Sequence, residues 1–266
     1  MSGETGKPLL EARGEINASA DQFEWYAEEA KRIYGHTIAG RHADERLAVG
    51  YQPVGPCLAL SAWNFPMLLP SRKIAAALAA GCSVMARPAS EAPGSCMALG
   101  QVLLDAGLPA GVLGILTGHA KPMVARLVQS KVICKVSLTG SVPVGKEILR
   151  LAADHVKKVT MELGGHAPVI VHADVDDVTD AITRANATGF GLAAYVFTHD
   201  SARAAMTAEA LEAGMVGINE TLLATAEAPF GGIKESGFGR EGGSLGILDY
   251  LTPKYIRHRL IVRNGT

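Results

Sequence analysis

The residues best suited to chemistry follow apolar, strand-like runs. Asn64 stands in A-W-N-F-P, directly after the run Cys57–Ser61, and its side-chain amide could donate to a developing oxyanion. Glu162 follows the run His155–Met161, where a carboxylate could act as a general base. Open α/β sheets bind ligands at the carboxyl ends of their strands. We therefore expect both side chains in one cleft.

A third candidate is a turn that could bind an anion. The apolar run Ile133–Leu138 leads into Thr139-Gly140-Ser141, and Pro143 then falls in the first turn of a predicted helix, where its missing N–H costs nothing. The free N–H groups and the positive dipole end of such a helix suit a phosphate. Gly140 and Gly145 do not complete the G-x-G-x-x-G fingerprint, so the turn alone is weak evidence for a nucleotide.

Each candidate also has an ordinary structural explanation. Asn64 could close a turn, and Glu162 could pair with a basic residue at a strand end. Arg87 ends the run Ser83–Arg87, where it could reach a ribose hydroxyl or a phosphate, or lie in solvent. Taken one at a time, none of these residues establishes a function.

Strands that alternate with helices must position these residues. Such alternation predicts a doubly wound, Rossmann-like α/β domain with a parallel sheet, over residues 53–163. The expected strands are Cys57–Ser61, Ser83–Arg87, Val112–Leu116, Ile133–Leu138 and His155–Met161, and the expected helices are Pro70–Ala80, Ser95–Asp105, Pro122–Gln129 and Val142–Ala153.

The flanking regions predict three further parts. Residues 1–52 hold a helix, Asp21–Tyr34, with Asp21 as its N-cap, and an extended arm over residues 37–51. Residues 164–250 form a thin α/β region whose three main strands cannot bury both faces of a sheet; Gly is frequent in its residues 230–243. Residues 251–266 carry an edge strand for oligomerisation, Tyr255–Val262. In the thin region the expected strands are 168–171, 195–197 and 215–219, and the expected helices 175–187 and 201–211.

Composition narrows the class of protein. The chain has 266 residues, 48% of them hydrophobic, and a net charge of −1, so it lacks the basic excess of a nucleic-acid-binding protein. It contains no apolar run long enough for a membrane span. Its four cysteines show no metal-ligand spacing, and no metal site is expected. Reduced, mostly buried thiols indicate a cytoplasmic protein.

The order of the motifs carries more information than any one of them. S-A-W-N-F-P, A-R-P-A-S, S-L-T-G-S-x-x-x-G, E-L-G-G-H-A-P, G-L-A-A-Y-V-F-T, G-M-V-G-I-N and P-F-G-G-I-K-E-S-G-F-G-R-E-G follow one another. Nearly the whole chain resembles the aldehyde dehydrogenase superfamily, most closely its succinate-semialdehyde dehydrogenase branch. That resemblance implies oxidation of an aldehyde by NAD or NADP through a thiohemiacetal on a cysteine.

The resemblance also implies roles for residues. Asn64 would be the oxyanion donor and Glu162 the general base. The adenosine would lie near Ser61 and Arg87, and the pyrophosphate near Gly140. The cofactor-binding residues that it implies are Ser61, Ala62, Trp63, Asn64, Arg87, Pro88, Ser90, Gly118, Thr139, Gly140, Ser141, Val144, Gly145, Glu162, Leu163 and Gly164. Arg87 and a neutral Ser90 favour NADP over NAD, because neither repels a 2′-phosphate.

The chain departs from the family in its second half. The family's G-Q-x-C, which holds the nucleophile, and its E-x-F-G-P are absent; the helix beginning near Asp176 runs almost at once into A-N-A-T-G. The family's amino-terminal segment is also missing. None of the four cysteines, Cys57, Cys82, Cys96 and Cys134, has the surroundings of the nucleophile.

Three interpretations remain open. The chain is a relative that binds NAD(P) without oxidising aldehydes, an active dehydrogenase that is incompletely recorded or completed by another chain, or a non-enzymatic assembly protein. The expected partners are a nicotinamide dinucleotide, a small aldehyde, and copies of the chain or full-length relatives.

Overall fold

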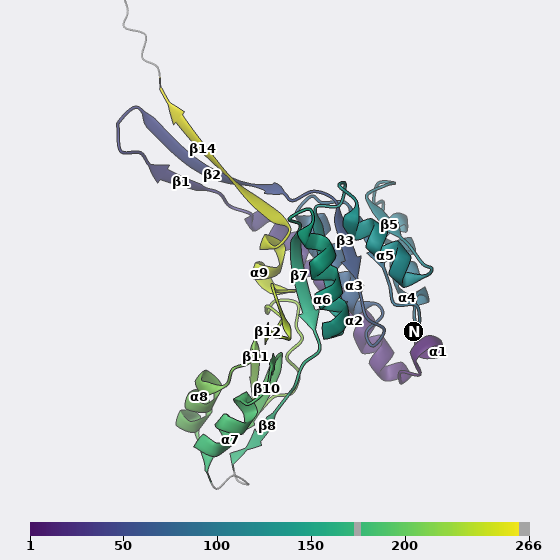
Figure 1. Ribbon diagram of the computed structural model, residues 1–266, viewed down its shortest axis with the longest axis vertical. Coiled ribbons are helices and arrows are strands. Elements are labelled where there is room, and N and C mark those ends of the chain that lie inside the picture. Colours follow the sequence, from purple (N-terminus) through teal and green to yellow (C-terminus); the bar gives the residue numbers. More distant parts are fainter. Residues whose placement is uncertain (173–176, 261–266) are drawn as a thin grey trace, which may run out of the picture.

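A six-stranded sheet forms the centre of the molecule. The computed structural model describes residues 1–172 and 177–260. The strand order is β13-β7-β6-β3-β4-β5, with all neighbours parallel except β13, which pairs antiparallel with β7 (Figure 1). The strands are β3 (Cys57–Leu60), β4 (Val84–Arg87), β5 (Leu113–Ile115), β6 (Lys135–Gly140), β7 (Lys158–Leu163) and β13 (Gly237–Phe238).

Helices cover both faces of this sheet, as the alternating pattern predicts. Along β3, Cys57 and Ala59 pack into one apolar cluster, while Leu58 and Leu60 pack into another on the opposite face. The first cluster holds α3 (Leu68–Ala79) and α4 (Gly94–Asp105), and the second holds α5 (Ala120–Gln129) and α6 (Val142–Ala153). The expected doubly wound fold is thus confirmed.

The first long helix starts much earlier than Asp21. After a short α1 (Ser2–Thr5), helix α2 runs over Leu9–Glu29 and continues as a 3-10 turn, Ala30–Arg32. Asp21 is an exposed residue inside the helix, so its prediction as N-cap was wrong. The residues of α2 that face the core recur every three or four positions but are largely polar, so a search for apolar periodicity does not find them. They include Ala12, Glu15, Ser19, Gln22 and Tyr26.

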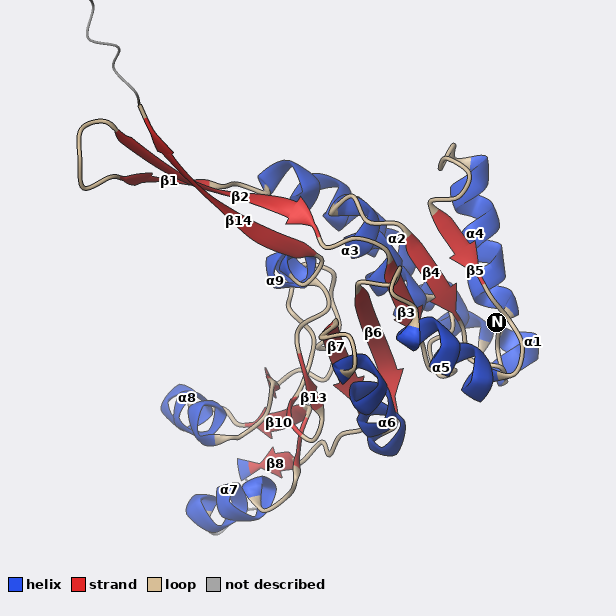
Figure 2. Ribbon diagram, turned by 45° about the horizontal axis from the view of Figure 1, so that its top comes forward, coloured by secondary structure: helices blue, strands red, loops and turns tan. Residues whose placement is uncertain are grey.

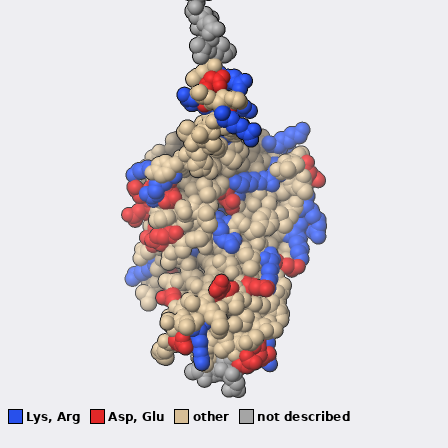
Figure 3. All heavy atoms as spheres, turned by 90° about the vertical axis from the view of Figure 1, so that its left-hand side faces the viewer, with Lys and Arg blue, Asp and Glu red and all other residues tan. Residues whose placement is uncertain are grey.

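A long antiparallel arm projects from the body (Figure 1). It consists of β1 (His36–Ala39), β2 (Glu45–Pro53) and β14 (Leu251–Arg259), in the order β1-β2-β14. The tail strand therefore begins at Leu251 and not at Tyr255, because it pairs with β2 from Pro53 onward. Residues 261 and 262 of the expected strand lie outside the described residues. On the face shown in Figure 3, acidic and basic side chains are interspersed along the arm and the body.

A second, smaller sheet forms the lower lobe. Its strands are β8 (Val169–Val171), β10 (Ala193–Phe197) and β11 (Met215–Ile218), all parallel in the order β11-β10-β8. Helices α7 (Val178–Asn186) and α8 (Ser201–Ala210) lie together on one side of it (Figure 2). The expected start of α7 at residues 175 and 176 lies outside the described residues.

Two strand boundaries differ from the prediction near the site. Strand β7 begins at Lys158, not at His155, and contains Glu162, because it pairs with β6 from Lys158 to Leu163, and β13 also pairs Gly237 with Glu162. Strand β6 begins at Lys135, not at Ile133, so Cys134 lies one residue before the strand. The Gly-rich stretch makes β12 (Ile233–Lys234), which pairs with β9 (Phe190–Gly191), and then β13; α9 (Gly243–Leu248) follows.

Among the described residues, no helix has the length and apolar character to cross a membrane.

Candidate functional site

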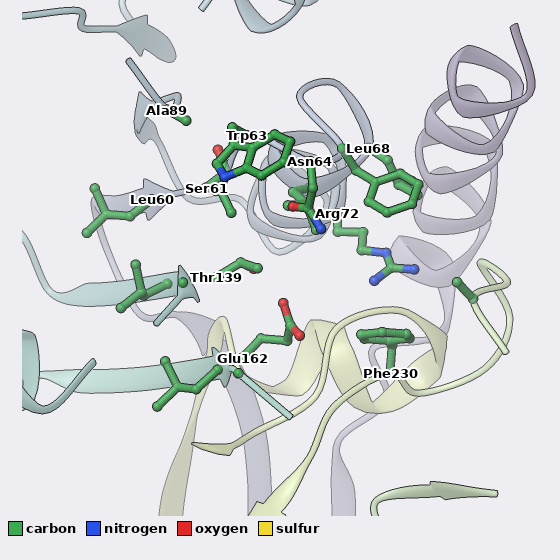
Figure 4. Close-up of a pocket in the computed structure, with 18 of the residues that line it drawn as sticks. Leu60, Ser61, Trp63, Asn64, Leu68, Arg72, Ala89, Thr139, Glu162 and Phe230 are labelled. Atoms are coloured by element: carbon green, nitrogen blue, oxygen red, sulfur yellow. The ribbon is translucent and has the colours of Figure 1, made fainter. Parts of the chain in front are cut away.

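One large cleft opens at the carboxyl ends of β3, β6 and β7. Its volume is about 1470 Å³, and its walls include Asn64, Thr139 and Glu162 (Figure 4). The parallel register brings these strand ends to one edge of the sheet, as expected. The cleft is lined by these members of the expected set: Ser61, Ala62, Trp63, Asn64, Arg87, Thr139, Gly140, Ser141, Val144, Glu162, Leu163 and Gly164.

The loop that carries Asn64 is held by the amino-terminal part of the chain. The Nζ atom of Lys7 donates to the backbone oxygen of Asn64 at 2.8 Å and lies 3.9 Å from the centre of the Phe65 ring. Lys7 is also ion-paired with the buried Glu15. Glu15 accepts hydrogen bonds from the N–H groups of Met67 and Leu68, at 2.8 and 3.1 Å, and so caps helix α3. The Asn64 side chain is exposed to the cleft between these supports.

Glu162 is a buried carboxyl group that faces the cleft. It is only 7% exposed, and its side chain points toward Asn64 and Arg72 (Figure 4). Burial raises the pKa of Glu162 and the nearby Glu241 adds to the rise, while Lys73, Thr139 and Arg72 oppose it. A raised pKa makes the Glu162 carboxylate a stronger proton acceptor than an exposed one, as a general base requires.

Arg72 is a buried cation that has no salt-bridge partner within residues 1–172 and 177–260. It is 2% exposed, its Nε has no hydrogen-bond partner among the described residues, and its guanidinium lies 4.3 Å from the centre of the Phe230 ring. Burial lowers its pKa, and the negative charges of Glu241 and Glu162 oppose that shift. In Figure 4 the guanidinium points into the cleft. Such a group is suited to hold an anion in two parallel hydrogen bonds.

A second buried cation is fully paired and supports the floor of the cleft. Lys73 forms an ion pair with Glu241 and donates to the hydroxyl of Thr139 at 2.6 Å. Ser137 also donates to Glu241, at 3.4 Å. The network ties α3 to β6 and to the loop before α9, so it fixes the strand end from which Thr139 lines the cleft.

Arg87 forms hydrogen bonds with two of the residues that were expected to bind the cofactor. Its Nη2 donates to the Ser90 hydroxyl at 2.5 Å and to the backbone oxygen of Gly118 at 3.5 Å. Its Nε is buried and has no partner among the described residues. Ser90 and Gly118 do not line the cleft themselves, nor does the buried Pro88. Arg87 is thus the member of this group that presents charge to the cleft.

The start of α6 can receive a phosphate. Ser141 is its N-cap in an extended conformation with no side-chain cap, and Pro143 stands in the first turn. The N–H groups of Ser141, Val142 and Val144 are available for a ligand in this geometry. Gly145 does not line the cleft: its N–H bonds to Ser141, and a Cβ there would lie 2.7 Å from a methyl of Leu163. Gly145 therefore lets α6 pack closely on β7. The turn, Arg87 and the volume together fit a dinucleotide.

No thiol lines this cleft. Cys57, Cys82 and Cys96 are buried, Cys134 is partly exposed, and all four are free. Cys57, Cys82 and Cys134 stand at the amino ends of their strands, at the opposite edge of the sheet from the cleft. Burial raises the pKa of the Cys96 thiol to about 12. Residues 1–172 and 177–260 also hold no cluster of three or more histidine, cysteine or acidic side chains that could bind a metal.

Sequence reasoning missed the buried charges. Arg72 and Lys73 interrupt the otherwise apolar run M-L-L-P-S-R-K-I-A-A-A, and two adjacent charges in such a run are a signal of buried function that could have been used. Lys7 and Glu15 carry no comparable signal, because polar residues surround them.

Comparisons with known proteins agree with this geometry. The sequence model described as "Aldehyde dehydrogenase family" matches residues 1–179 and, in a second segment, residues 174–256. The succinate-semialdehyde dehydrogenase (NADP+) GabD of Escherichia coli is 33% identical over 385 positions, which cover 96% of this chain and 80% of that protein. A glutarate-semialdehyde dehydrogenase of Pseudomonas putida is 33% identical over 383 positions, with coverage of 96% and 80%.

Solved structures give the same result. A crystal structure described as an Escherichia coli NADP-dependent enzyme superposes with a TM-score of 0.95 at 32% identity, and the match covers 97% of this chain and 81% of that one. The alignment with GabD is longer than the 266 residues of the chain, so at least 119 of its 385 positions have no counterpart here. The two matched segments meet near residues 174–179, which places the interruption directly after β8.

Proposed function

The chain belongs to the aldehyde dehydrogenase family, and from this premise we propose that it binds NADP or NAD together with an anionic aldehyde, without oxidising the aldehyde as an isolated chain. The observation that carries this proposal is the cleft itself. It holds a phosphate-binding helix start, a free guanidinium and a buried carboxyl group, but no thiol.

The proposed cofactor site runs from Arg87 to Glu162. Ser141, Val142 and Val144 would donate N–H groups to the pyrophosphate, and Arg87 with Ser90 would contact the ribose or its 2′-phosphate. The bound nicotinamide would accept two electrons from the aldehyde as a hydride. We propose the same cofactor-binding residues that the sequence predicted, except that Gly145 acts by letting α6 pack on β7. We assign it to the domain of residues 53–163.

The proposed substrate is an aldehyde that carries a carboxylate. Arg72 presents a desolvated positive charge beside Asn64 and Glu162 (Figure 4). The relatives act, by name, on succinate semialdehyde and glutarate semialdehyde, which both bear a carboxylate. In this assignment Arg72 binds the carboxylate, Asn64 polarises the carbonyl oxygen, and Glu162 accepts a proton from water.

The missing thiol limits the reaction to binding. Without a nucleophile near Asn64, no covalent adduct forms from which a hydride can leave. The reduced thiols support the expected cytoplasmic location. The unpaired outer edge of β14, nine residues long, supports the expected association with copies or relatives through the arm.

A fluorescence titration with NADPH tests the proposed cofactor site. We expect saturable binding by the intact chain and its loss in Val144→Asp, because a carboxylate at the start of α6 repels phosphate while it still suits the helix dipole. Val102→Asp, on the exposed side of α4, is the matched control and should bind normally. Equal binding by all three proteins would place the nucleotide elsewhere.

A further inference from the structure

The small sheet has an uncovered face and an unpaired edge strand. We propose that these surfaces bind a second polypeptide of the same family, which supplies in trans the part of the site that this chain lacks. The proposal rests on the proposed function, because it assigns the cleft a role that only a partner can complete.

Only one face of the small sheet is covered. Ile170 and Val196 pack with α7 and with Leu211, which follows α8, on that face. The opposite face carries Val169 and Val171, 59% and 36% exposed, beside the half-buried Tyr195 and Phe197, with which they are in register. Both crossovers of the sheet run in one direction, so the right-handed rule places both helices on the same side (Figure 2). Parallel sheets are normally buried on both faces.

The edge of the sheet is also open. The backbone oxygen of Pro168 accepts the N–H of Tyr195, so Pro168 and Ile170 bond toward β10. Alternation along the strand then directs the N–H and C=O groups of Val169 and Val171 away from β10. No described strand pairs with them, since β8 ends the order β11-β10-β8. A strand of another polypeptide can add there.

The alignment identifies the occupant of this surface. The positions that the relatives have and this chain lacks, at least 119 in GabD, fall near residues 174–179, where the two matched segments meet, shortly after β8. A segment that starts at the end of an edge strand is placed to pair with that strand and to cover its open face. The partner is therefore a polypeptide that contains this segment, and not an unrelated protein.

The loops that lead into β8 and β10 border the cleft. Gly165, between β7 and β8, lies so close to Leu192 at the start of β10 that a Cβ would be 2.4 Å from the Leu192 Cβ. Both residues line the cleft, as does Leu222, which is 68% exposed. The small sheet therefore lies beside the cleft, and we propose that a polypeptide docked on its open face extends to the cleft and brings a thiol to Asn64 and Glu162.

The completed site performs a balanced oxidation. The partner's thiol would add to the aldehyde carbon, bound NADP+ would serve as the two-electron oxidant by accepting a hydride, and Glu162 would take the proton of the water that displaces the thiol. One aldehyde, one NADP+ and one water give one carboxylate, one NADPH and two protons. The partner provides the nucleophile, and this chain provides the cofactor site, the oxyanion donor and the base.

Complementation with a defined segment tests the proposal. The probe is the GabD segment that aligns between His172 and Asp177, co-expressed with the intact chain as a separate polypeptide. We expect a complex by size-exclusion chromatography with light scattering, and NADPH formation from succinate semialdehyde that neither polypeptide shows alone. A segment whose cysteines are changed to alanine should still bind but give no NADPH.

A pair of variants tests whether the open face is the docking surface. Val169→Lys places a charge on the open face, and Met206→Lys places one on α8, on the covered side; both original side chains are exposed. Complex formation should fall at least tenfold in Val169→Lys and stay unchanged in Met206→Lys. Equal effects of the two changes would overturn the proposal.

A chimera keeps the test decisive if the separate segment does not fold. In it the same segment is inserted between His172 and Asp177 of this chain. If the chimera is active but the separate segment folds and does not bind the chain, then the proposal that a second polypeptide supplies the segment is overturned. An inactive chimera would overturn the role of this face altogether. NADPH titration of the unmodified chain reports separately on the proposed cofactor site, so the two failures are distinguishable.

Discussion

Buried charges define what the cleft can bind. Arg72, Lys73 and Glu162 are all buried near the cleft; among the described residues Lys73 forms an ion pair with Glu241, while Arg72 and Glu162 form none. A buried charge without a partner is costly, so the free guanidinium and the raised pKa of Glu162 mark the places where a ligand can compensate.

The raised pKa of Glu162 should be measurable as a pH dependence of stability. Because the folded protein favours the protonated carboxyl, its ionisation reduces stability as the pH rises above the ordinary value of 4.5. We expect the melting temperature of Glu162→Gln, relative to the unmodified chain, to increase between about pH 4 and pH 8. The exposed Glu235→Gln is the control. A constant difference across this range would show that Glu162 is not destabilised by ionisation.

Arg72 should determine affinity for a carboxylate in the cleft. Succinate, the acid of the proposed aldehyde class, serves as the probe in calorimetry with saturating NADPH. We expect Arg72→Met to weaken binding by about ten- to a hundredfold, as for loss of a hydrogen bond between charged groups. Arg72→Lys should retain part of the affinity. Undiminished binding by Arg72→Met would place the carboxylate elsewhere.

Arg87 should determine the preference between the two cofactors. The guanidinium can donate two hydrogen bonds to a 2′-phosphate, worth about 1.5–3 kcal/mol. We expect NADP to bind more tightly than NAD, and Arg87→Ala to reduce the ratio of the affinities by about one to two decades. Arg203→Ala, in the small lobe, is the control. An unchanged ratio would show that Arg87 does not contact the phosphate.

Among the elements, helix α2 is the support of the Asn64 loop. Glu15 caps α3 and holds Lys7, which in turn bonds to Asn64. The helix is therefore part of the architecture of the site, although the sequence places it about 50 residues before Asn64.

Removal of the Glu15 carboxylate should loosen this support. We expect Glu15→Ala to reduce the free energy of unfolding by about 3 kcal/mol, because two N–H groups and a largely buried ammonium lose their partner. Glu11→Ala, one turn earlier in the helix, should change it by less than about 0.5 kcal/mol. Urea unfolding of both variants provides the comparison, and equal stabilities would contradict the role of Glu15.

At the scale of the molecule, the sequence patterns predicted those features that depend on residues close together in the chain. The alternation of apolar strands and helices predicted the large sheet, and strand ends predicted the convergence of Asn64 and Glu162. The missed features depend on contacts distant in sequence. The start of α2 was hidden because tertiary contacts bury its polar stripe, and Glu162 lies inside β7 because that strand pairs there with β6 and with β13, about 75 residues later.

The same distinction explains the unfinished lobe. The three strands of this lobe were expected to be too few to bury both faces of a sheet, and in the described residues the apolar cluster lies on one face. The relatives have at least 119 aligned positions that this chain lacks, and we propose that the cover of this face belongs to them. No pattern within the 266 residues could have supplied it.

One measurement tests the central claim most directly. Purified chain of confirmed intact mass is mixed with NADP+ and succinate semialdehyde, and the absorbance of NADPH is followed after NADPH titration has shown the cofactor site to be functional. We predict saturable NADPH binding and no NADPH formation, not even one equivalent per chain. Formation of NADPH that is lost when Cys57, Cys82, Cys96 or Cys134 is changed to Ser would identify a nucleophile in this chain and contradict the account.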